Sequence, residues 1–212
     1  MPPMDKVHLY LFDQYDALPD GFVAEHLLLL PSARQEQCLR YRQAIDQQNC
    51  VIAYLLLQQG LREEYGITDQ AIFTYGAHGK PCLKSHPNIF FNISHCKHGV
   101  ACALADFEIG VDIQDVRPYD PSIARRVCSE AELRLLSEAN DPARLFCKLW
   151  ATRESYAKML GCSMADTLGK KLPLHSIEII SNKNFYIAFT SLHYRQYHLC
   201  CNNLSWPEIS PL

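Results

Sequence analysis

The sequence predicts an α+β fold, because its strand-like and helix-like segments come in separate runs. Short apolar segments with strand character lie at residues 72–75, 89–94, 100–105 and 109–116. Helical patterns follow at residues 120–161, and strand character returns at residues 177–200. Separate runs of strands and helices are typical of α+β proteins. The sequence also predicts two compact halves that meet near residues 106–109.

The overall composition indicates an ordinary globular protein. The chain has 212 residues, with 48% hydrophobic and 20% charged side chains, which is enough for one large domain or two small ones. Its net charge of -3 argues against a general nucleic-acid binder, which needs an excess of cations. The longest apolar run, Val51–Leu57, is shorter than the about 20 residues of a membrane-spanning helix. Because residues 1–20 contain no uninterrupted apolar core, we expect no signal peptide and a cytoplasmic location.

The ten cysteines contain no C-x-x-C pair. The densest group is His95, Cys96, His98 and Cys102, and no second pair with the spacing of a zinc ribbon or finger accompanies it. Most of the cysteines lie in apolar segments, where a thiol behaves as a small hydrophobic side chain. The sequence therefore predicts reduced, structural thiols. A cysteine-rich metal-binding or structural protein is an alternative, and stoichiometric zinc in the purified protein would reveal it.

The first half carries signals for one long helix and a set of strands. Val7–Phe12 alternates like a strand, and Asp46–Leu61 is predicted as a helix with Asp46 as its N-cap. A tight His95–Gly99 turn interrupts the run of strands that follows.

The second half carries three helix starts and a hairpin. Asp120-Pro121 is an N-cap followed by a first-turn proline, Ser129-x-x-Glu132 is a capping box, and Asp141-Pro142 begins a helix that Gly161 ends. The predicted strands of the tail are residues 177–180, 185–189 and 194–200, with a hairpin turn at residues 182–184.

The helix that ends at Gly161 has two different faces. One face is apolar and consists of Leu145, Leu149, Tyr156 and Met159. On the other side, Trp150, Glu154 and Lys158 follow one another at i, i+4 spacing. A surface Glu–Lys pair at this spacing is the commoner interpretation and contributes about 0.2–0.5 kcal/mol. Because Trp150 shares the row, the alternative is a half-buried carboxylate that acts as a general base or a metal ligand.

The octet Ile109–Val116 places Asp112 and Gln114 on one face of a strand, because residues two apart point the same way. A carboxylate beside an amide oxygen suits a hard cation such as Mg²⁺. Taken alone, a partly exposed strand with a polar solvent face is the more economical interpretation.

The segment Phe90–Cys96 ends in Ser94 and His95, where a strand runs into a turn. Neighbours on a strand point in opposite directions, so these two residues do not form a nucleophile–base pair. The Ser94 hydroxyl with a His95 imidazolium is instead a reasonable phosphate-binding pair. Upstream, Gly79-Lys80-Pro81 presents one cation on a stiff corner, and the familiar nucleotide-binding loops G-x-x-x-x-G-K-[ST] and G-x-G-x-x-G are absent.

These motifs follow one another in a specific order: G-K-P, F-N-I-S-H, I-G-V-D-I-Q and W-x-x-R-E-S-Y-x-K. From Gly79 to about Pro173 this order closely resembles the Sfp-type 4′-phosphopantetheinyl transferases, which typically show G-K-P, F-N-x-S-H-S, (V/I)-G-(V/I)-D-x-E and W-(S/T/A)-x-K-E-(S/A)-x-x-K. The resemblance implies a monomer of two similar α/β halves related by a pseudo-twofold, here residues 1–106 and 107–212. It also implies that coenzyme A binds in the cleft between the halves.

The resemblance further implies an activity and a set of site residues. The expected reaction transfers 4′-phosphopantetheine from coenzyme A to a serine of an apo acyl or peptidyl carrier protein, with Mg²⁺. The residues implied for coenzyme A are Lys80, Pro81, Ser94, His95, Asp112 and Lys158. The residues implied for the metal are Asp112, Gln114 and Glu154. Glu154 is the expected general base, and Lys158 would offset charge on the pyrophosphate.

Two departures from the family pattern bear on these expectations. Gln114 stands where the family has a third acidic ligand, which predicts weaker metal binding. Gln47, Gln48 and Asn49 fill the helix region where the family usually carries an arginine that reaches coenzyme A. Arg34, Arg40 and Arg42 are the candidates to replace that arginine. In addition, Arg153 stands at the position of the family's lysine in the last motif.

The expected partners are coenzyme A and a carrier protein, with no nucleic acid and no membrane. Because carrier proteins are acidic, a basic docking patch is expected, with Arg117, Arg125 and Arg126 as candidates and a plain solvated helix face as the alternative. A non-catalytic coenzyme A or carrier-binding module with a degraded metal site is the second hypothesis. The sequence leaves open whether the carrier serves fatty-acid, polyketide, polyunsaturated-lipid or nonribosomal-peptide synthesis.

Overall fold

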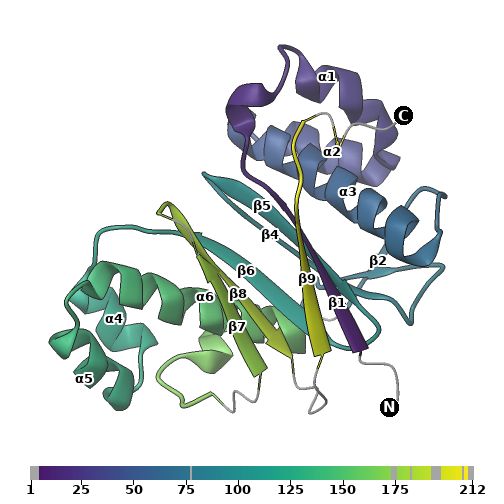
Figure 1. The fold of residues 1–212 in the computed structure, drawn as a ribbon. Coiled ribbons are helices and arrows are strands. Elements are labelled where there is room, and N and C mark those ends of the chain that lie inside the picture. Colours follow the sequence, from purple (N-terminus) through teal and green to yellow (C-terminus); the bar gives the residue numbers. More distant parts are fainter. Residues whose placement is uncertain are drawn as a thin grey trace.

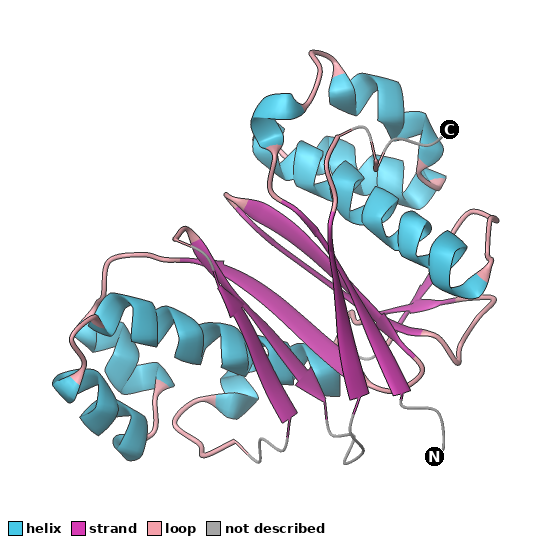
Figure 2. Cartoon of the chain, in the orientation of Figure 1, coloured by secondary structure: helices cyan, strands magenta, loops and turns pink. Residues whose placement is uncertain are grey.

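A computed structural model describes residues 5–76, 78–172, 176–181, 183–191, 197–206 and 208–209. The strands are β1 (Asp5–Phe12), β2 (Phe73–Tyr75), β3 (Pro81–Leu83), β4 (Phe90–Cys96), β5 (Gly99–Ala105), β6 (Ile109–Asp115), β7 (Ser176–Ser181), β8 (Phe185–Ser191) and β9 (Tyr197–Asn203). The α-helices are α1 (Phe22–His26), α2 (Ser32–Arg40), α3 (Ala44–Tyr65), α4 (Pro121–Val127), α5 (Glu130–Glu138) and α6 (Pro142–Leu160). Short 3-10 turns are η1 (Tyr15–Ala17), η2 (Leu27–Leu29) and η3 (Met164–Thr167). The predicted α+β class is confirmed (Figures 1 and 2).

The two main sheets have the same strand topology. The first has the order β4-β5-β1-β9 and the second has the order β6-β8-β7. In each, a first strand precedes a long helix, and an antiparallel hairpin follows whose second strand pairs with the first strand. After β8 the chain leaves the second sheet, and β9 pairs parallel with β1 at the edge of the first sheet (Figure 1).

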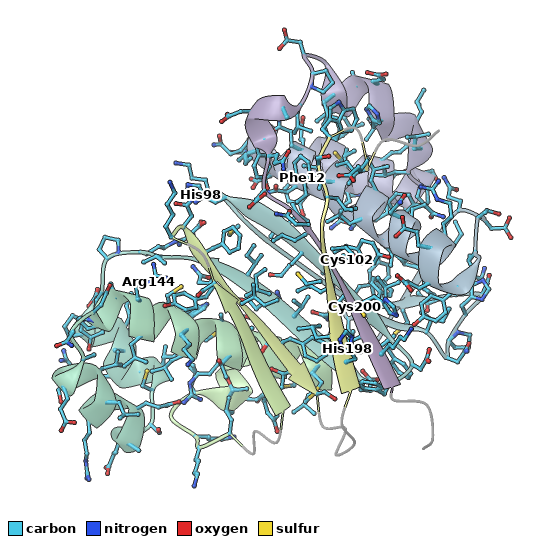
Figure 3. The ribbon with its side chains drawn as sticks, in the orientation of Figure 1. Phe12, His98, Cys102, Arg144, His198 and Cys200 are labelled. Atoms are coloured by element: carbon cyan, nitrogen blue, oxygen red, sulfur yellow. The ribbon has the colours of Figure 1, made fainter. Side chains whose placement is uncertain are left out.

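Two apolar layers hold these elements together. Tyr10 and Phe12 of β1 are fully buried in a cluster with side chains of α3, and Figure 3 labels Phe12. Alternate residues of β1, such as Leu9, point the other way and share a buried cluster with Val111 and Ile113 of β6. The strand is therefore buried on both faces, because alternate side chains point to opposite faces. Through this second cluster the first sheet packs against the second sheet.

Helix α6 lies unusually close to β6 at Gly110. A Cβ atom at Gly110 would stand 1.8 Å from the carbonyl oxygen of Ser155, so only glycine fits there. The ends of α6 follow the predicted signals: the Asp141 carboxylate accepts a hydrogen bond from the backbone N–H of Arg144, and Gly161 adopts a left-handed conformation with a φ of 63°. These signals fix where the helix begins and ends.

Most predicted elements of the chain are confirmed. The Asp120 cap of α4 and the Ser129–Glu132 capping box of α5 are both present. β7 and β8 form the predicted hairpin, although residue 182 of its turn and residues 194–196 of the last predicted strand lie outside the described residues. All ten cysteines are free thiols, which agrees with the prediction of reduced cysteines, and five of them are buried: Cys38, Cys50, Cys102, Cys128 and Cys147. Over the described ranges, no helix has the length and apolarity to cross a bilayer.

The start of the long helix in the first half was predicted wrongly. α3 begins at Ala44 with Gln43 as its N-cap, and Asp46 lies inside its first turn. A carboxylate is favourable in that turn because the helix dipole is positive there. Helices α1 and α2 and the short strand β3 were not predicted, since they carry no strong apolar period or capping signal.

Candidate active site

Three side chains from three elements meet where the first sheet packs against β6 and α6. The Lys158 ammonium on α6 donates to Asp112 Oδ1 on β6 at 2.7 Å and to Ser94 Oγ on β4 at 2.7 Å. The hydroxyl of Ser94 in turn donates to Asp112 Oδ1 at 2.7 Å. Ser94 and Asp112 are each only 5% exposed. Residues from three separate sequence motifs thus share one polar cluster.

Asn92 and Gly110 bring these elements together. The Asn92 side-chain oxygen accepts a hydrogen bond from the Val111 N–H at 3.0 Å and so fixes β4 against β6. Asn92 is 4% exposed, and loss of its side chain would leave the Val111 N–H without a partner and so destabilise the folded protein. The close approach of α6 at Gly110 then carries Lys158 over Asp112. Asn92 belongs to the F-N-I-S-H motif, but it was not among the predicted site residues.

The carboxylates of Asp112 and Glu154 fit a divalent cation. Asp112 Oδ2 is buried and has no hydrogen-bond partner within the described part of the chain. Glu154 lies one turn before Lys158 on α6 and is half-buried. Burial and, second, the Asp112 charge raise the pKa of Glu154, while Lys158 opposes the rise. A bound Mg²⁺ would satisfy the orphaned Asp112 oxygen and would stabilise the ionised form of Glu154, which the Asp112 charge disfavours.

Gln114 follows Asp112 by two residues on β6 and is partly exposed. Its side-chain N–H donates to the backbone oxygen of Asp115 at 3.3 Å. No group of three or more His, Cys, Asp or Glu side chains within metal-binding reach occurs among the described residues. This agrees with the sequence, in which the third position of the expected ligand set is an amide.

Lys80 and Pro81 line a groove of about 220 Å³ together with His78, Gly79, Asn92, Ile93, Lys158, Gly161 and Cys162. The Lys80 ammonium donates to the Met159 carbonyl oxygen at 2.7 Å and pairs with Glu108. The Lys80 ammonium therefore contacts the end of α6. The cation that contacts Ser94 is Lys158 instead. Glu108 was missed from the sequence; it is a carboxylate that a phosphate ligand would compete with for Lys80.

His95 is an exposed residue at the end of β4. Partial burial of the ring and then the Lys158 charge lower its pKa, and Arg34 acts in the same direction. Arg34 is thus the candidate arginine whose charge reaches this end of the site, and its Nε is buried without a hydrogen-bond partner in the described ranges. Arg40 instead pairs with Glu36 on the surface, with a side chain that is 79% exposed.

Comparison with known proteins agrees with this arrangement. A family model described as the 4′-phosphopantetheinyl transferase superfamily matches residues 108–205. The chain belongs to the 4′-phosphopantetheinyl transferase superfamily. The match covers β6, which carries Asp112, and α6, which carries Glu154 and Lys158.

Curated relatives of this superfamily extend the similarity into the first half. The chain is 34% identical to 4′-phosphopantetheinyl transferase ffp of Bacillus subtilis and 30% identical to 4′-phosphopantetheinyl transferase Sfp of Bacillus subtilis strain 168, each over 149 residues. Each alignment covers 69% of this chain and 64% of the relative. L-aminoadipate-semialdehyde dehydrogenase-phosphopantetheinyl transferase of Saccharomyces cerevisiae is 30% identical over 164 residues, which are 71% of this chain and 60% of the relative. The chain thus spans less than two thirds of the length of these relatives.

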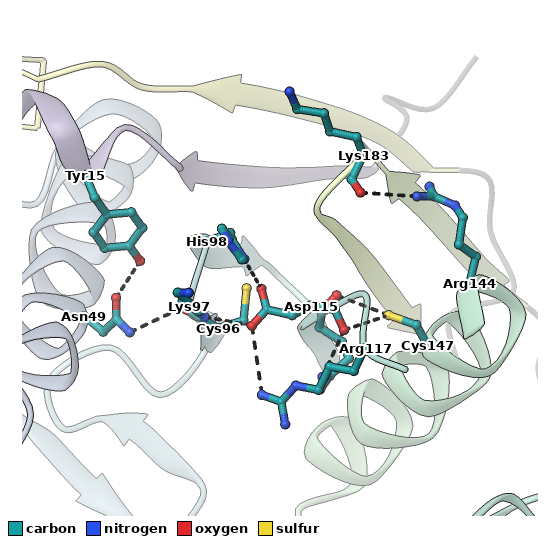
Figure 4. Close-up of polar contacts among 11 residues, drawn as sticks. Tyr15, Asn49, Cys96, Lys97, His98, Asp115, Arg117, Arg144, Cys147 and Lys183 are labelled. Atoms are coloured by element: carbon teal, nitrogen blue, oxygen red, sulfur yellow. Dashed lines mark hydrogen bonds and ion pairs between the residues drawn. The ribbon is translucent and has the colours of Figure 1, made fainter. Parts of the chain in front are cut away.

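A second polar cluster in this superfamily member surrounds the buried Asp115 (Figure 4). Its carboxylate contacts the His98 ring at 2.7 Å and accepts from the Lys97 N–H at 3.0 Å, and Arg117 lies 4.0 Å away. Burial alone would raise the pKa of Asp115, but the hydrogen bonds from His98, Cys96 and Lys97 together lower it. Asp115 therefore ties the β4–β5 turn, where His98 lies (Figure 3), to the end of β6. This contact could not be predicted from local sequence patterns, because it joins distant segments.

An apolar cavity of about 180 Å³ opens beside Gln114. Its wall consists of Gln114, Asp115, Arg117, Pro118, Asp120, Ile123, Ala143, Phe146, Cys147 and Trp150. The predicted row on α6 thus has Trp150 in this cavity and Lys158 in the polar cluster.

Arg153, which stands at the family's lysine position, does not face the site. Its side chain is fully buried, donates to the carbonyl oxygens of Thr167 at 2.6 Å and Lys170 at 3.0 Å, and pairs with Glu132. The guanidinium therefore joins α5, α6 and the segment after α6. In this chain Arg153 stabilises the packing of α5, α6 and the segment after α6.

Proposed function

We propose that this protein transfers the 4′-phosphopantetheine group of coenzyme A to a serine of an apo acyl or peptidyl carrier protein and releases adenosine 3′,5′-bisphosphate. The observation that carries the proposal is the contact of Ser94, Asp112 and Lys158 at the junction of the halves. Relatives that match 69% of the chain are named 4′-phosphopantetheinyl transferases, which supports the same reaction.

In the proposed reaction the carrier serine oxygen forms a bond to the β-phosphorus of coenzyme A, and the bond from that phosphorus to the bridging pyrophosphate oxygen breaks. Glu154 accepts the serine proton, directly or through water. Its raised pKa suits this role, because a general base works best when its pKa lies near the working pH. Lys158 offsets the charge that develops on the pyrophosphate, as fixed cations do in phosphoryl transfer.

Asp112 and Glu154 would hold Mg²⁺, with Gln114 at the third position as a neutral or water-mediated ligand. When bound, the metal would supply charge neutralisation at the pyrophosphate. The orphaned Asp112 oxygen supports this assignment.

We assign the phosphates of coenzyme A to Lys80, Pro81, Ser94 and His95, with Asp112 and Lys158 at the pyrophosphate. Arg34 replaces the family's arginine in this proposal, because it is the candidate whose charge reaches His95. The pantetheine arm is the part of coenzyme A beyond the β-phosphate, and its mixed amide and apolar chain suits the cavity beside Gln114 and Trp150.

The carrier protein is proposed to dock beside this cavity. Arg117 lines it and its side chain is 72% exposed, and the exposed Arg125 and Arg126 lie in the last turn of α4. A positive patch at this place complements an acidic carrier.

We further propose that residues 1–106 and 107–212 form two halves related by a pseudo-twofold, with β9 returned to the first sheet. The β4-β5-β1 part of the first sheet and the β7-β8-β6 order of the second have the same topology, and a long helix lies within each half; both observations support this division. A monomer in the cytoplasm is the proposed state of the protein.

Mass spectrometry of carrier proteins tests the proposed activity. Purified protein with Mg²⁺ and coenzyme A is expected to add one phosphopantetheine mass to the serine of an apo carrier. A panel of fatty-acid, polyketide, polyunsaturated-lipid and nonribosomal-peptide carriers would identify the pathway. If no carrier in the panel gains this mass, while a known transferase modifies the same carriers, the proposed activity is wrong.

The second candidate is a non-catalytic coenzyme A or carrier-binding module, which the amide at Gln114 favours. The substitution Gln114→Glu separates the two functions. A modest change in turnover and tighter apparent Mg²⁺ binding are expected for a working enzyme. A rise from no turnover to robust turnover would show that the metal site had been degraded.

A further inference from the structure

Asn49 on α3 is a buried amide whose two ends make different contacts (Figure 4). The residue is 2% exposed, and its Oδ1 accepts a hydrogen bond from the Tyr15 hydroxyl at 2.5 Å. Its Nδ2 lies 3.4 Å from the Cys96 carbonyl oxygen and 3.5 Å from Nδ1 of His95. The amide therefore connects η1, α3 and the end of β4, which carries His95.

The chemistry of the partners fixes the orientation of this amide. The Cys96 carbonyl oxygen can only accept, so the NH₂ end of Asn49 must face it. Burial raises the pKa of Tyr15, so its hydroxyl keeps its proton and donates to Oδ1. A flipped Asn49 amide would place its oxygen against the Cys96 carbonyl oxygen, with no donor between them.

This orientation has a consequence for His95. The NH₂ group has two hydrogens, and its two neighbours are the Cys96 carbonyl oxygen and His95 Nδ1. Nδ1 must then carry a lone pair, and a neutral imidazole with an acceptor at Nδ1 has its proton at Nε2. Partial burial and the Lys158 charge lower the pKa of His95 and so favour the neutral ring.

We propose that Tyr15 and Asn49 are positioning residues that hold His95 in its Nε2-protonated tautomer, so that the ring offers one N–H donor to a phosphate oxygen of coenzyme A. The identity of the ligand rests on the proposed function, whereas the tautomer is a property of the free protein. Asn49 lies in the segment Gln47–Asn49, where the resembling transferases carry an arginine. In this chain the segment acts on the phosphate through His95, and Lys158 and Arg34 supply the positive charge.

Nitrogen-15 NMR of the histidine rings in the free protein tests the tautomer. The wild-type spectrum is expected to show a pyridine-type Nδ1 and a pyrrole-type Nε2 for His95, with His95→Gln identifying the signal. Tyr15→Phe, which removes only the hydroxyl that donates to Asn49 Oδ1, is expected to give a mixture of tautomers. Asn49→Ala is expected to give a more even mixture. Asn49→Asp, which offers only acceptors, should shift the proton to Nδ1.

Two matched controls accompany these variants. Tyr75→Phe removes the hydroxyl of a tyrosine that is 58% exposed, and Gln48→Ala truncates the neighbour of Asn49 on α3. Both should leave the His95 signal unchanged. A pyrrole-type Nδ1 in the wild type, or a spectrum that neither Tyr15→Phe nor Asn49→Ala alters, would overturn the proposal.

Steady-state kinetics test the second part, the effect on coenzyme A. Asn49→Ala and Tyr15→Phe are expected to raise KM for coenzyme A about five- to tenfold, which corresponds to one lost hydrogen bond, with kcat within about twofold. An unchanged KM in variants whose tautomer has changed would overturn the positioning role. Absence of transfer by the wild type, with the expected tautomer, would contradict the proposed function and leave the tautomer supported.

Discussion

At the residue scale, Glu154 shows how the surroundings of a side chain change the role predicted for it. On the helix alone it forms an i, i+4 pair with Lys158, as many surface glutamates do. In the structure Lys158 contacts Asp112 and Ser94 instead, and Glu154 is half-buried beside them. Its pKa is raised by burial and by Asp112, which a solvated surface glutamate would not show.

Glu154→Gln is expected to lower kcat by about 10²- to 10⁴-fold, the usual contribution of a general base. The amide is close in shape to the carboxylate, so coenzyme A binding should remain measurable by calorimetry. Glu25→Gln, on the exposed surface of α1, is the control and should keep full turnover. Wild-type turnover in Glu154→Gln would show that another group accepts the serine proton.

The same substitution is expected to stabilise the metal-free protein at neutral pH. Because the pKa of Glu154 is higher in the folded than in the unfolded state, ionisation favours the unfolded state. The folded wild type therefore loses stability as pH rises from about 4.3, the ordinary value for glutamate, through the raised folded value. Chemical unfolding with a chelator present should show Glu154→Gln more stable at pH 7.5 than the wild type. The gap should close below about pH 4, and an equal gap at both pH values would contradict this assignment.

At the scale of the elements, the site depends on how closely α6 lies on β6 and on how its partner helices are joined. Gly110 sets the distance, since a side chain there would overlap the backbone of Ser155. Arg153 ties α6 to α5 and to the segment after it from a fully buried position. Both features stabilise the position of Lys158 without contacting any ligand.

Gly110→Ala is expected to destabilise the protein by at least about 3 kcal/mol, because the added methyl group forces the helix off the strand. Gly76→Ala is the matched control, since a Cβ there meets only the Lys80 carbonyl oxygen at 3.6 Å. Urea unfolding measures both variants. Equal midpoints for Gly110→Ala and the wild type would mean that α6 packs differently.

Arg153→Met is expected to destabilise the protein by about 3–5 kcal/mol, as removal of one partner from a buried ion pair does. Arg153→Lys should lie between Arg153→Met and the wild type, because an ammonium cannot make the same set of bonds as the planar guanidinium. The free energy of unfolding is the readout. A change in KM for coenzyme A with unchanged stability would place Arg153 in the ligand site.

At the scale of the whole molecule, two sheets of the same topology place their inner faces together, and the polar cluster lies at their junction. The first half contributes Ser94, His95 and Asn49, and the second half contributes Asp112, Glu154 and Lys158. Neither half alone brings these groups together. β9 fastens the two halves, because it pairs with β1 after the chain has passed through the second sheet.

The double substitution Arg125→Glu and Arg126→Glu is expected to raise KM for an acidic carrier about tenfold and to leave KM for coenzyme A unchanged. The wild-type KM for the carrier should also rise with salt, since surface charges are screened. Lys6→Glu, at an exposed position of β1, controls for net charge. An equal rise in both KM values would show that these arginines act on coenzyme A or on stability.

The sequence by itself determined the features that depend on neighbours along the chain. The caps of α4, α5 and α6 and the alternation of the strands are local signals, and they predicted the elements and the α+β class. The motif order also pointed to the family, because each motif keeps its side chains at fixed spacing. By contrast, the cap of α3 was misplaced, since Gln43 carries none of the usual capping chemistry.

The tertiary structure alone decided which distant groups meet. Four contacts join segments far apart in sequence: Lys80 with Glu108, Arg153 with Glu132, Asp115 with His98, and Asn49 with His95. The pairing of β9 with β1 has no local signal either. Such contacts depend on how the sheets and helices pack, because hydrophobic burial fixes their positions and the polar side chains then find the partners within reach.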